Sequence, residues 1–301
     1  MLTVPEAPVE LPEWREPWRT GGLIHTLRQP WLLWHLVLME RGDRYKGTLL
    51  GGMFWAFAQP LTRFFMYYVI VGQVLGLVKR VPNFGIYVFC GIVMAQFFNA
   101  ALKSGTRSMA RSTSLLRKVN LPREAIPATA VLSQIMRLGP ASVILLIVAV
   151  LTGWRPNHLV GVPYAIAGIT LVTVFLIGLG LLLSVGNAYV RDISMAVSLV
   201  TMLTHWISPV MYPLDLVTKT LGSGALYTIY VANPLTIAMF GLRQTFWYPT
   251  VPPPLAAQNA GSIPAASIVL SIAIALGTLG AGIVVAHRFS HRLVLRGKWS
   301  S

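Results

Sequence analysis

A row of polar side chains runs through one apolar segment, residues 193–212, and it is the strongest candidate for chemistry in this chain. Serine, threonine, histidine and tyrosine recur there every three or four positions, at Ser194, Ser198, Thr201, His205, Ser208 and Tyr212. This spacing places all six on one face of a helix, with an apolar face opposite. Hydroxyl groups in a row offer many weak contacts, which suits the lining of a hydrophilic passage. The alternative is that each hydroxyl bonds the backbone of its own helix.

A second row of this kind lies in the apolar segment at about 48–72, where Trp55, Gln59, Arg63 and Tyr67 share one helical face. A charge that faces lipid is costly, so this face should meet protein or water. It is therefore either a polar seam in helix packing or a second lining of the passage. Arg137 raises a similar question, since it either bonds carbonyls inside the bundle or contacts an anionic headgroup or substrate.

The acidic residues argue against catalysis and against ion coupling. After residue 43 only Glu124, Asp192 and Asp215 remain, and none lies in the middle of an apolar segment. Proton- and sodium-coupled carriers usually keep acids inside the membrane. The sequence also lacks paired carboxylates, metal-spaced His/Cys clusters and a GxxxxGK[ST] phosphate loop. We therefore predict no catalytic residue, no metal site and no cofactor on this chain.

Composition identifies an all-α integral membrane protein. The chain has 301 residues, 55% hydrophobic and 11% charged, with a mean hydropathy of +0.65. The net charge of +15 does not indicate nucleic-acid binding, because the basic residues lie between the apolar segments. Six spans are predicted, at about 48–72, 83–102, 126–151, 160–186, 193–212 and 265–286. Cys90 lies within the second span as a core thiol, and a single cysteine forms no internal disulfide.

Three parts of the chain are expected. Residues 1–47 form a cytoplasmic arm with an amphipathic interface helix at about 30–43, which is too short to cross. Residues 48–290 form the membrane domain, and residues 291–301 form a basic cytoplasmic tail. Few cations fall in the predicted outer segments: Lys79, Arg80, Arg155, Lys219 and Arg243. The excess of cations on the other side places both termini in the cytoplasm.

The outer region at about 212–262 holds an apolar stretch split at Asn233 and Pro234. The halves at 214–231 and 234–248 are each too short to cross, so they are predicted to dip into the membrane and return. The alternative is two ordinary helices at the membrane surface.

The segment 103–124 is strongly basic and lies between the second and third spans. It carries Lys103, Arg107, Arg111, Arg117, Lys118 and Arg123 against one acid, Glu124. It is either a solvated loop that follows the positive-inside rule or a short cytoplasmic helix, at about 103–116, that docks into another protein.

Five short motifs resemble one transporter family, in order, over about residues 30–290. They are RYKG at 44–47, KVNLPREAIP at 118–127, NAYVRD at 187–192, SPVMYPLDLV at 208–217 and NPLT at 233–236. These motifs are similar to those of the membrane subunits of polysaccharide-exporting ABC transporters. The likeness is greatest to the actinobacterial galactan exporters.

This resemblance implies a homodimeric permease in the bacterial cytoplasmic membrane that pairs with two separate ABC ATPase subunits, which carry ATP and Mg. It implies export of a polyprenyl-pyrophosphate-linked polysaccharide such as an O-antigen, teichoic acid or galactan precursor. The interface helix and the 103–116 helix would contact the ATPase, spans one and five would line the channel, and Asn233 and Pro234 would belong to the outer gate. The residues implied in ATPase coupling are Lys103, Arg107, Arg111, Leu115, Arg117, Lys118, Arg123 and Glu124.

Arg41, Arg44 and Lys46 stand at the predicted inner membrane edge, where they either attract the anionic headgroup of the substrate or anchor the interface helix to lipid. Two other functions remain open: an ABC permease for drugs or small lipids, and a membrane scaffold without transport. The hydroxyl row favours a glycan over a drug, because sugars need aromatic faces and hydroxyl contacts without strong binding.

Overall fold

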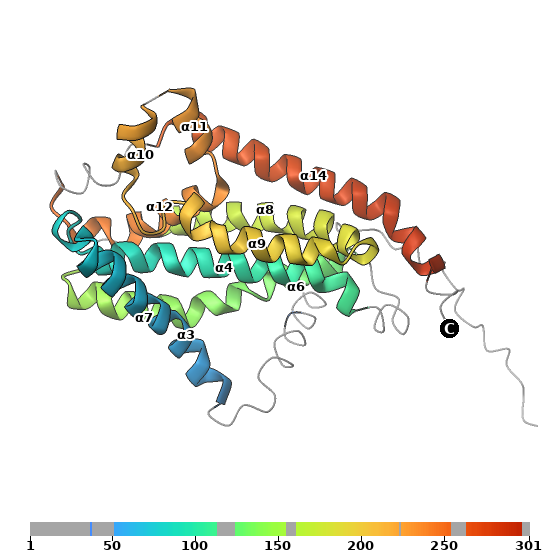
Figure 1. Cartoon of the computed structure of the whole chain (residues 1–301), viewed down its shortest axis with the longest axis horizontal. Helices are drawn as coiled ribbons and strands as arrows, with labels where there is room; N and C mark the ends of the chain where they lie inside the picture. Colours follow the sequence, from blue (N-terminus) through green and yellow to red (C-terminus); the bar gives the residue numbers. More distant parts are fainter. Residues whose placement is uncertain are drawn as a thin grey trace, which may run out of the picture.

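The structure of this chain is a computed structural model that describes residue 37 and residues 51–112, 124–154, 161–222, 224–253 and 263–296. All regular secondary structure in these ranges is helical (Figure 1). The interface helix at 30–43 and the basic tail stay predictions, because apart from residue 37 they lie outside the described residues or, at 291–296, on side chains that are not described.

The α-helices are α3 (Gly51–Tyr67), α4 (Phe84–Arg111), α6 (Ala125–Leu132), α7 (Leu138–Leu151), α8 (Val162–Tyr189), α9 (Asp192–Ile207), α10 (Leu214–Leu221), α11 (Ala225–Val231), α12 (Pro234–Phe246) and α14 (Ala265–Arg296). A π-helix at Tyr68–Val74 extends α3, and 3-10 turns lie at Leu77–Lys79, Ile135–Arg137 and Tyr248–Thr250.

Four helical segments in the described part are long and apolar enough to cross a membrane: Phe84–Arg111, Ala125–Leu151, Val162–Tyr189 and Ala265–Arg288. A fifth arises if α11 and the segment Pro234–Thr250, which meet at 73°, are counted as one broken span. The chain is thus an all-helical, multi-pass membrane protein in these ranges. A total of six membrane spans stays a prediction, since α3 and α9 are shorter than the four segments that are long enough to cross.

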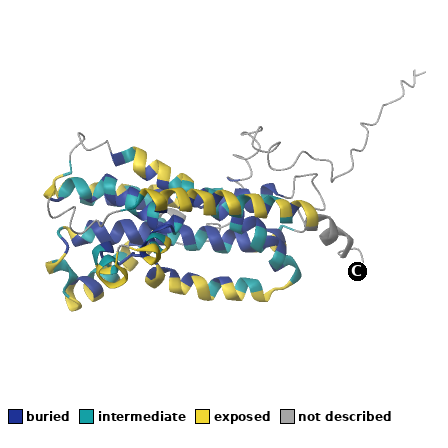
Figure 2. Cartoon of the chain, turned by 90° about the horizontal axis from the view of Figure 1, so that it is seen from above, coloured by how far each residue is buried: buried dark blue, intermediate teal, exposed yellow. Residues whose placement is uncertain are grey.

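Helix α4 is the centre of the bundle. In its most apolar stretch 78% of residues are buried, against 17% in α14, which lies along one edge (Figure 1). Buried residues gather in the middle of the molecule and exposed ones on its outer helices (Figure 2). Small residues let neighbouring backbones approach α4: Gly105 lies against Gly180 of α8, and a Cβ on Gly91 would lie 2.6 Å from the carbonyl oxygen of Val210.

Two helix ends differ from the sequence-based boundaries. Helix α4 continues through Arg111 instead of ending at residue 102, because Ser104, Gly105 and Ser108 are buried in the bundle while Arg107 and Arg111 face outward. Residues 103–111 are therefore the last turns of α4, not a separate helix. Helix α9 ends at Ile207 instead of residue 212, because Ser208 precedes Pro209 and takes an extended conformation.

Candidate functional site

The polar row of α9 faces the inside of the bundle. Thr201, His205 and Ser208 are buried, whereas Leu199 and Leu203 on the opposite face are exposed. The two-faced helix expected from the spacing is therefore present. Its polar face meets the chain's own helices, and its apolar face is left for lipid or another protein. A channel lined by this row stays a prediction.

The first three hydroxyls of the row bond the backbone of their own helix. The hydroxyl of Ser194 donates to the carbonyl of Arg191 at 3.0 Å, that of Ser198 to Ser194 at 2.9 Å, and that of Thr201 to Ser198 at 2.7 Å. These contacts satisfy the groups locally, as polar residues in apolar helices require. Ser198 also accepts from the Nη2 of Arg107 on α4, at 3.5 Å.

The rows of α3 and α9 meet at one point, where the ring of Tyr67 stacks on His205 with centroids 5.8 Å apart. The Nε2 of His205 is buried there without a hydrogen-bond partner. Trp55 and Arg63 are exposed, so α3 presents both an aromatic and a cationic side chain at its surface. Gln59, from the same row, is also exposed and lines a pocket against α4.

Beyond the end of α9, a small polar network joins three helices. Asn233 accepts from the backbone N–H of Leu235 at 3.0 Å and so caps α12, while Pro234 occupies the first helical position. Its side-chain amide donates to Ser208 at 3.3 Å. The hydroxyls of Tyr212 and Tyr230 lie 2.8 Å apart. The structure thus brings together residues of two of the family motifs, 208–217 and 233–236.

The helices after α9 are shorter than the predicted halves. The stretch 214–231 contains α10, which ends at Leu221, and α11, which begins at Ala225, and α12 ends at Phe246. Helices α10 and α11 lie at one end of the bundle, beyond α9 (Figure 1). The sharp angle between α11 and α12 fits either a broken span or a re-entrant loop.

Arg243 is a residue whose contacts the sequence reasoning missed. The charge pattern counts it among the outer cations, and the structure adds that its side chain on α12 is buried, with 7% exposed. Its Nη2 donates to the carbonyls of Pro209 and Val210, at 2.6 and 3.0 Å, and its Nε donates to Tyr87 at 3.4 Å. The guanidinium also lies 3.7 Å from the centre of the Tyr87 ring. The sequence held one signal for this contact: Pro209 ends α9, and the end of a helix leaves carbonyls that a buried arginine can satisfy.

The basic end of α4 carries the described part of the predicted coupling residues. Lys103 is half-buried, and Arg107 and Arg111 are exposed. Arg111 donates to Ser104 at 3.4 Å. Glu124 is buried at the start of α6, with its Oε1 3.8 Å from Nδ1 of His287 on α14, so it contacts its own chain. The other predicted sites, Leu115, Arg117, Lys118, Arg123, Arg41, Arg44 and Lys46, lie outside the described residues.

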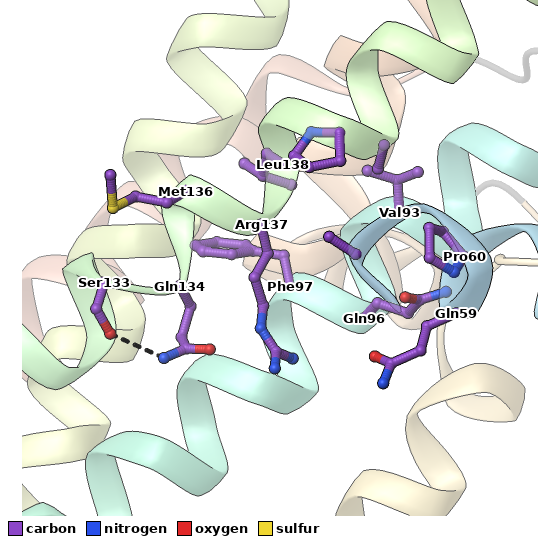
Figure 3. Close-up of a pocket in the computed structure, with 13 residues that line it drawn as sticks. Gln59, Pro60, Val93, Gln96, Phe97, Ser133, Gln134, Met136, Arg137 and Leu138 are labelled. Atoms are coloured by element: carbon purple, nitrogen blue, oxygen red, sulfur yellow. Dashed lines mark hydrogen bonds between the residues drawn. The ribbon is translucent and has the colours of Figure 1, made fainter. Parts of the chain in front are cut away.

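A pocket that three glutamines and one arginine line together with apolar residues lies between α3, α4 and the junction of α6 and α7. Figure 3 shows the guanidinium of Arg137 pointing into it, with Gln134 on one side and Gln96 and Gln59 on the other. The guanidinium of Arg137 has no hydrogen bond or ion pair within the described residues, so the expected carbonyl contacts of this side chain are not present there.

Comparison with known proteins adds to this geometry. A family model described as ABC-2 type transporter matches residues 33–247. The chain is similar to the O-antigen export system permease protein RfbA of Myxococcus xanthus, with 26% identity over 235 residues, covering 77% of this chain and 87% of that protein. Two proteins of the same name from Klebsiella pneumoniae are 25% and 24% identical over 216 residues, covering 70% of this chain and 79% of each relative.

Proposed function

Because the chain belongs to the ABC-2 type transporter family and is thus a transporter membrane subunit, not an enzyme, we propose that it forms the passage of an ABC exporter for a polyprenyl-pyrophosphate-linked polysaccharide. The observation that carries the proposal is the similarity to O-antigen export permeases along 77% of the chain. In this proposal the chain works as a homodimer with two ABC ATPase subunits, which bind ATP and Mg.

The proposed topology has six spans with both termini in the cytoplasm. The four qualifying helical segments supply four spans. Helix α3 with its π-helical extension, residues 51–74, supplies a fifth, and α9 with the following turn supplies the sixth. Helices α10 to α12 then form the re-entrant outer gate. The 24-residue length of 51–74 supports a crossing, because about 20 residues span the apolar core.

Exposed aromatic side chains support a glycan as the cargo. Trp55 and Phe65 of α3 and Trp206 of α9 are 43%, 68% and 68% exposed. Sugars stack their apolar ring faces on aromatic rings, so a passage between two copies of α3 and α9 would offer such platforms. In this arrangement Trp206, which the polar row omits, joins Trp55 at the lining, while Ser194, Ser198 and Thr201 support the helix from behind.

The direct test of export is ATP hydrolysis by the reconstituted complex in response to its cargo. Proteoliposomes holding this chain and its partner ATPase are expected to hydrolyse ATP severalfold faster with a lipid-linked glycan on the side of the ATPase, and Trp206→Ala should reduce this stimulation. Stimulation by amphipathic drugs with no response to the glycan would contradict the proposal in favour of a drug permease. No change in ATP hydrolysis with either would favour a scaffold.

Coupling is expected to depend on the exposed basic end of α4. The double variant Arg107→Glu, Arg111→Glu should lower co-purification of the ATPase by about tenfold or more, since reversing desolvated interface charges typically costs about 2 kcal/mol or more. The double variant Lys79→Glu, Arg80→Glu, at the exposed turn before α4, is the matched control. Equal loss in both variants would show a general effect of charge and would refute docking at α4.

The outer gate is expected to depend on Asn233. Asn233→Leu removes the cap of α12 and the bond to Ser208, which together cost about 1–3 kcal/mol. We expect a severalfold faster leak of a small fluorescent solute from proteoliposomes without ATP. Thr220→Val, which loses only a bond to its own helix backbone on α10, should leak like wild type. An Asn233→Leu variant that leaks no faster than wild type would show that Asn233 does not hold the gate closed.

A further inference from the structure

The pocket around Arg137 lies midway along the bundle and has no part in the passage proposed above. Gln96 and Phe97 line it near the middle of α4, Ala56 and Gln59 line it from α3, and Arg137 lines it from the 3-10 turn before α7. Its volume of about 70 Å³ is several times the ~15 Å³ that one water molecule needs. The pocket therefore has room for a small polar group.

Two prolines leave backbone carbonyls in the pocket lining without their usual helical hydrogen-bond donors. Pro140 has no N–H to donate to the carbonyl of Met136, and Pro60 has none for the carbonyl of Ala56. All four of these residues line the pocket. The missing backbone hydrogen bond between Pro140 and Met136 also explains why the helix tightens into a 3-10 turn at Ile135–Arg137. Helix breaks at membrane depth are tolerated where the backbone lines a cavity.

The donors of the pocket are only partly satisfied by the chain. The amide nitrogen of Gln134 already donates to Ala130 and Ser133, at 3.2 and 2.9 Å. The amide nitrogen of Gln96, by contrast, is buried without a partner. Arg137 adds a guanidinium that no described residue pairs. A buried amide donor left unbonded costs about 1–3 kcal/mol, and an arginine within the membrane costs at least about that.

No acid is among the described residues that line the pocket, so no described carboxylate there balances the charge of Arg137. The side chain of Arg137 is exposed while the Gln96 amide is buried, so the pocket opens on the side of Arg137. Pro140 of the pocket lining and the exposed apolar residue Ile147 are seven positions apart, so they lie on one face of α7, and this face meets the membrane. A ligand that arrives laterally from lipid reaches the site without crossing the bundle.

We propose that this pocket binds the phosphate group of a membrane-embedded lipid, with the phosphate charge on Arg137 and a phosphate oxygen accepting from Gln96. Planar guanidinium groups bind phosphate through two parallel hydrogen bonds, which suits this geometry. Two sources share this chemistry: an anionic phospholipid of the bilayer and a polyprenyl-linked phosphate. The second source rests on the proposed function, and the first does not.

Thermal unfolding of the purified complex with its ATPase, in a neutral detergent, tests the site. Phosphatidylglycerol, polyprenyl phosphate and diacylglycerol, which has no phosphate, are added in separate titrations. Wild type is expected to gain stability saturably with at least one of the two phosphate-bearing lipids, and by more than it gains with diacylglycerol. A response to phosphatidylglycerol assigns bulk phospholipid, whereas a response to polyprenyl phosphate alone assigns the substrate carrier.

Matched variants decide whether Arg137 is the contact. Arg137→Gln is expected to weaken binding by about tenfold or more, the loss of a charged hydrogen bond. Arg137→Lys should retain part of the affinity, and Arg80→Gln, at the exposed turn before α4, should bind as wild type does. Gln96→Leu should weaken binding yet stabilise the lipid-free protein, because it removes a buried unpaired donor.

Two results would overturn the proposal: wild type that responds equally to all three lipids, or Arg137→Gln that binds as tightly as wild type. Neither result bears on the export assay, which is measured separately with the glycan. A failed lipid site and a failed export function are therefore distinguishable.

Discussion

Gly178→Leu is expected to detach α14 from α8 and to destabilise the protein by about 3 kcal/mol or more. A Cβ at residue 178 would lie 2.5 Å from the backbone nitrogen of Leu279, and one at Gly282 would lie 2.6 Å from the carbonyl oxygen of Gly178. The two backbones are therefore in direct contact, as small residues permit between membrane helices. No side-chain rotation can relieve a clash with backbone atoms.

The measurement is thermal unfolding of the detergent-purified protein, followed by loss of the monodisperse peak on size-exclusion chromatography. Each kcal/mol corresponds to about 2–4 °C for a chain of this size, so a fall of roughly 6–12 °C is expected. Gly280→Leu is the control, because it lies on α14 and a Cβ added there would have no neighbouring atom within 4 Å. A loss at Gly280 as large as that at Gly178 would contradict the contact.

Arg243→Met is expected to open the interface between α4, α12 and the turn after α9. The variant keeps much of the side-chain volume but leaves the carbonyls of Pro209 and Val210 without their donor, at about 1–3 kcal/mol for each buried group. Arg243→Lys should rescue little, because one ammonium cannot reproduce the fork of donors or the stacking on Tyr87.

Cys90 supplies a probe for this opening. It is the single cysteine of the chain, it is fully buried on α4, and its Sγ lies 3.8 Å from the carbonyl oxygen of Leu242, next to Arg243. Labelling by a maleimide is expected to be at least about tenfold faster in Arg243→Met than in wild type, since the free energy of local opening falls by more than about 1.4 kcal/mol. Arg80→Met removes an exposed cation and should label at the wild-type rate. Slow labelling in Arg243→Met would show that this arginine does not hold the interface.

Helix periodicity predicted the helix limits correctly where residues close in sequence determine them. The helical segments at the predicted third, fourth and sixth spans begin and end within a few residues of the predicted limits, except that α14 continues to Arg296. The five motifs were sufficient for the family, which the match over residues 33–247 confirms. Periodicity failed at the end of α4, because burial of Ser104 and Gly105 against other helices overrides the polar composition of 103–111.

The sequence by itself determined an apolar helical chain, the face that Ser198, Thr201 and His205 share, and the family. These depend on composition, on 3.6-residue spacing and on short contiguous motifs. Only the tertiary structure decided that this face turns inward, that Arg243 bonds carbonyls more than thirty residues away, and that Arg137 lies in a pocket among three glutamines. Those outcomes depend on contacts between distant segments, which residue type and spacing along the chain do not specify.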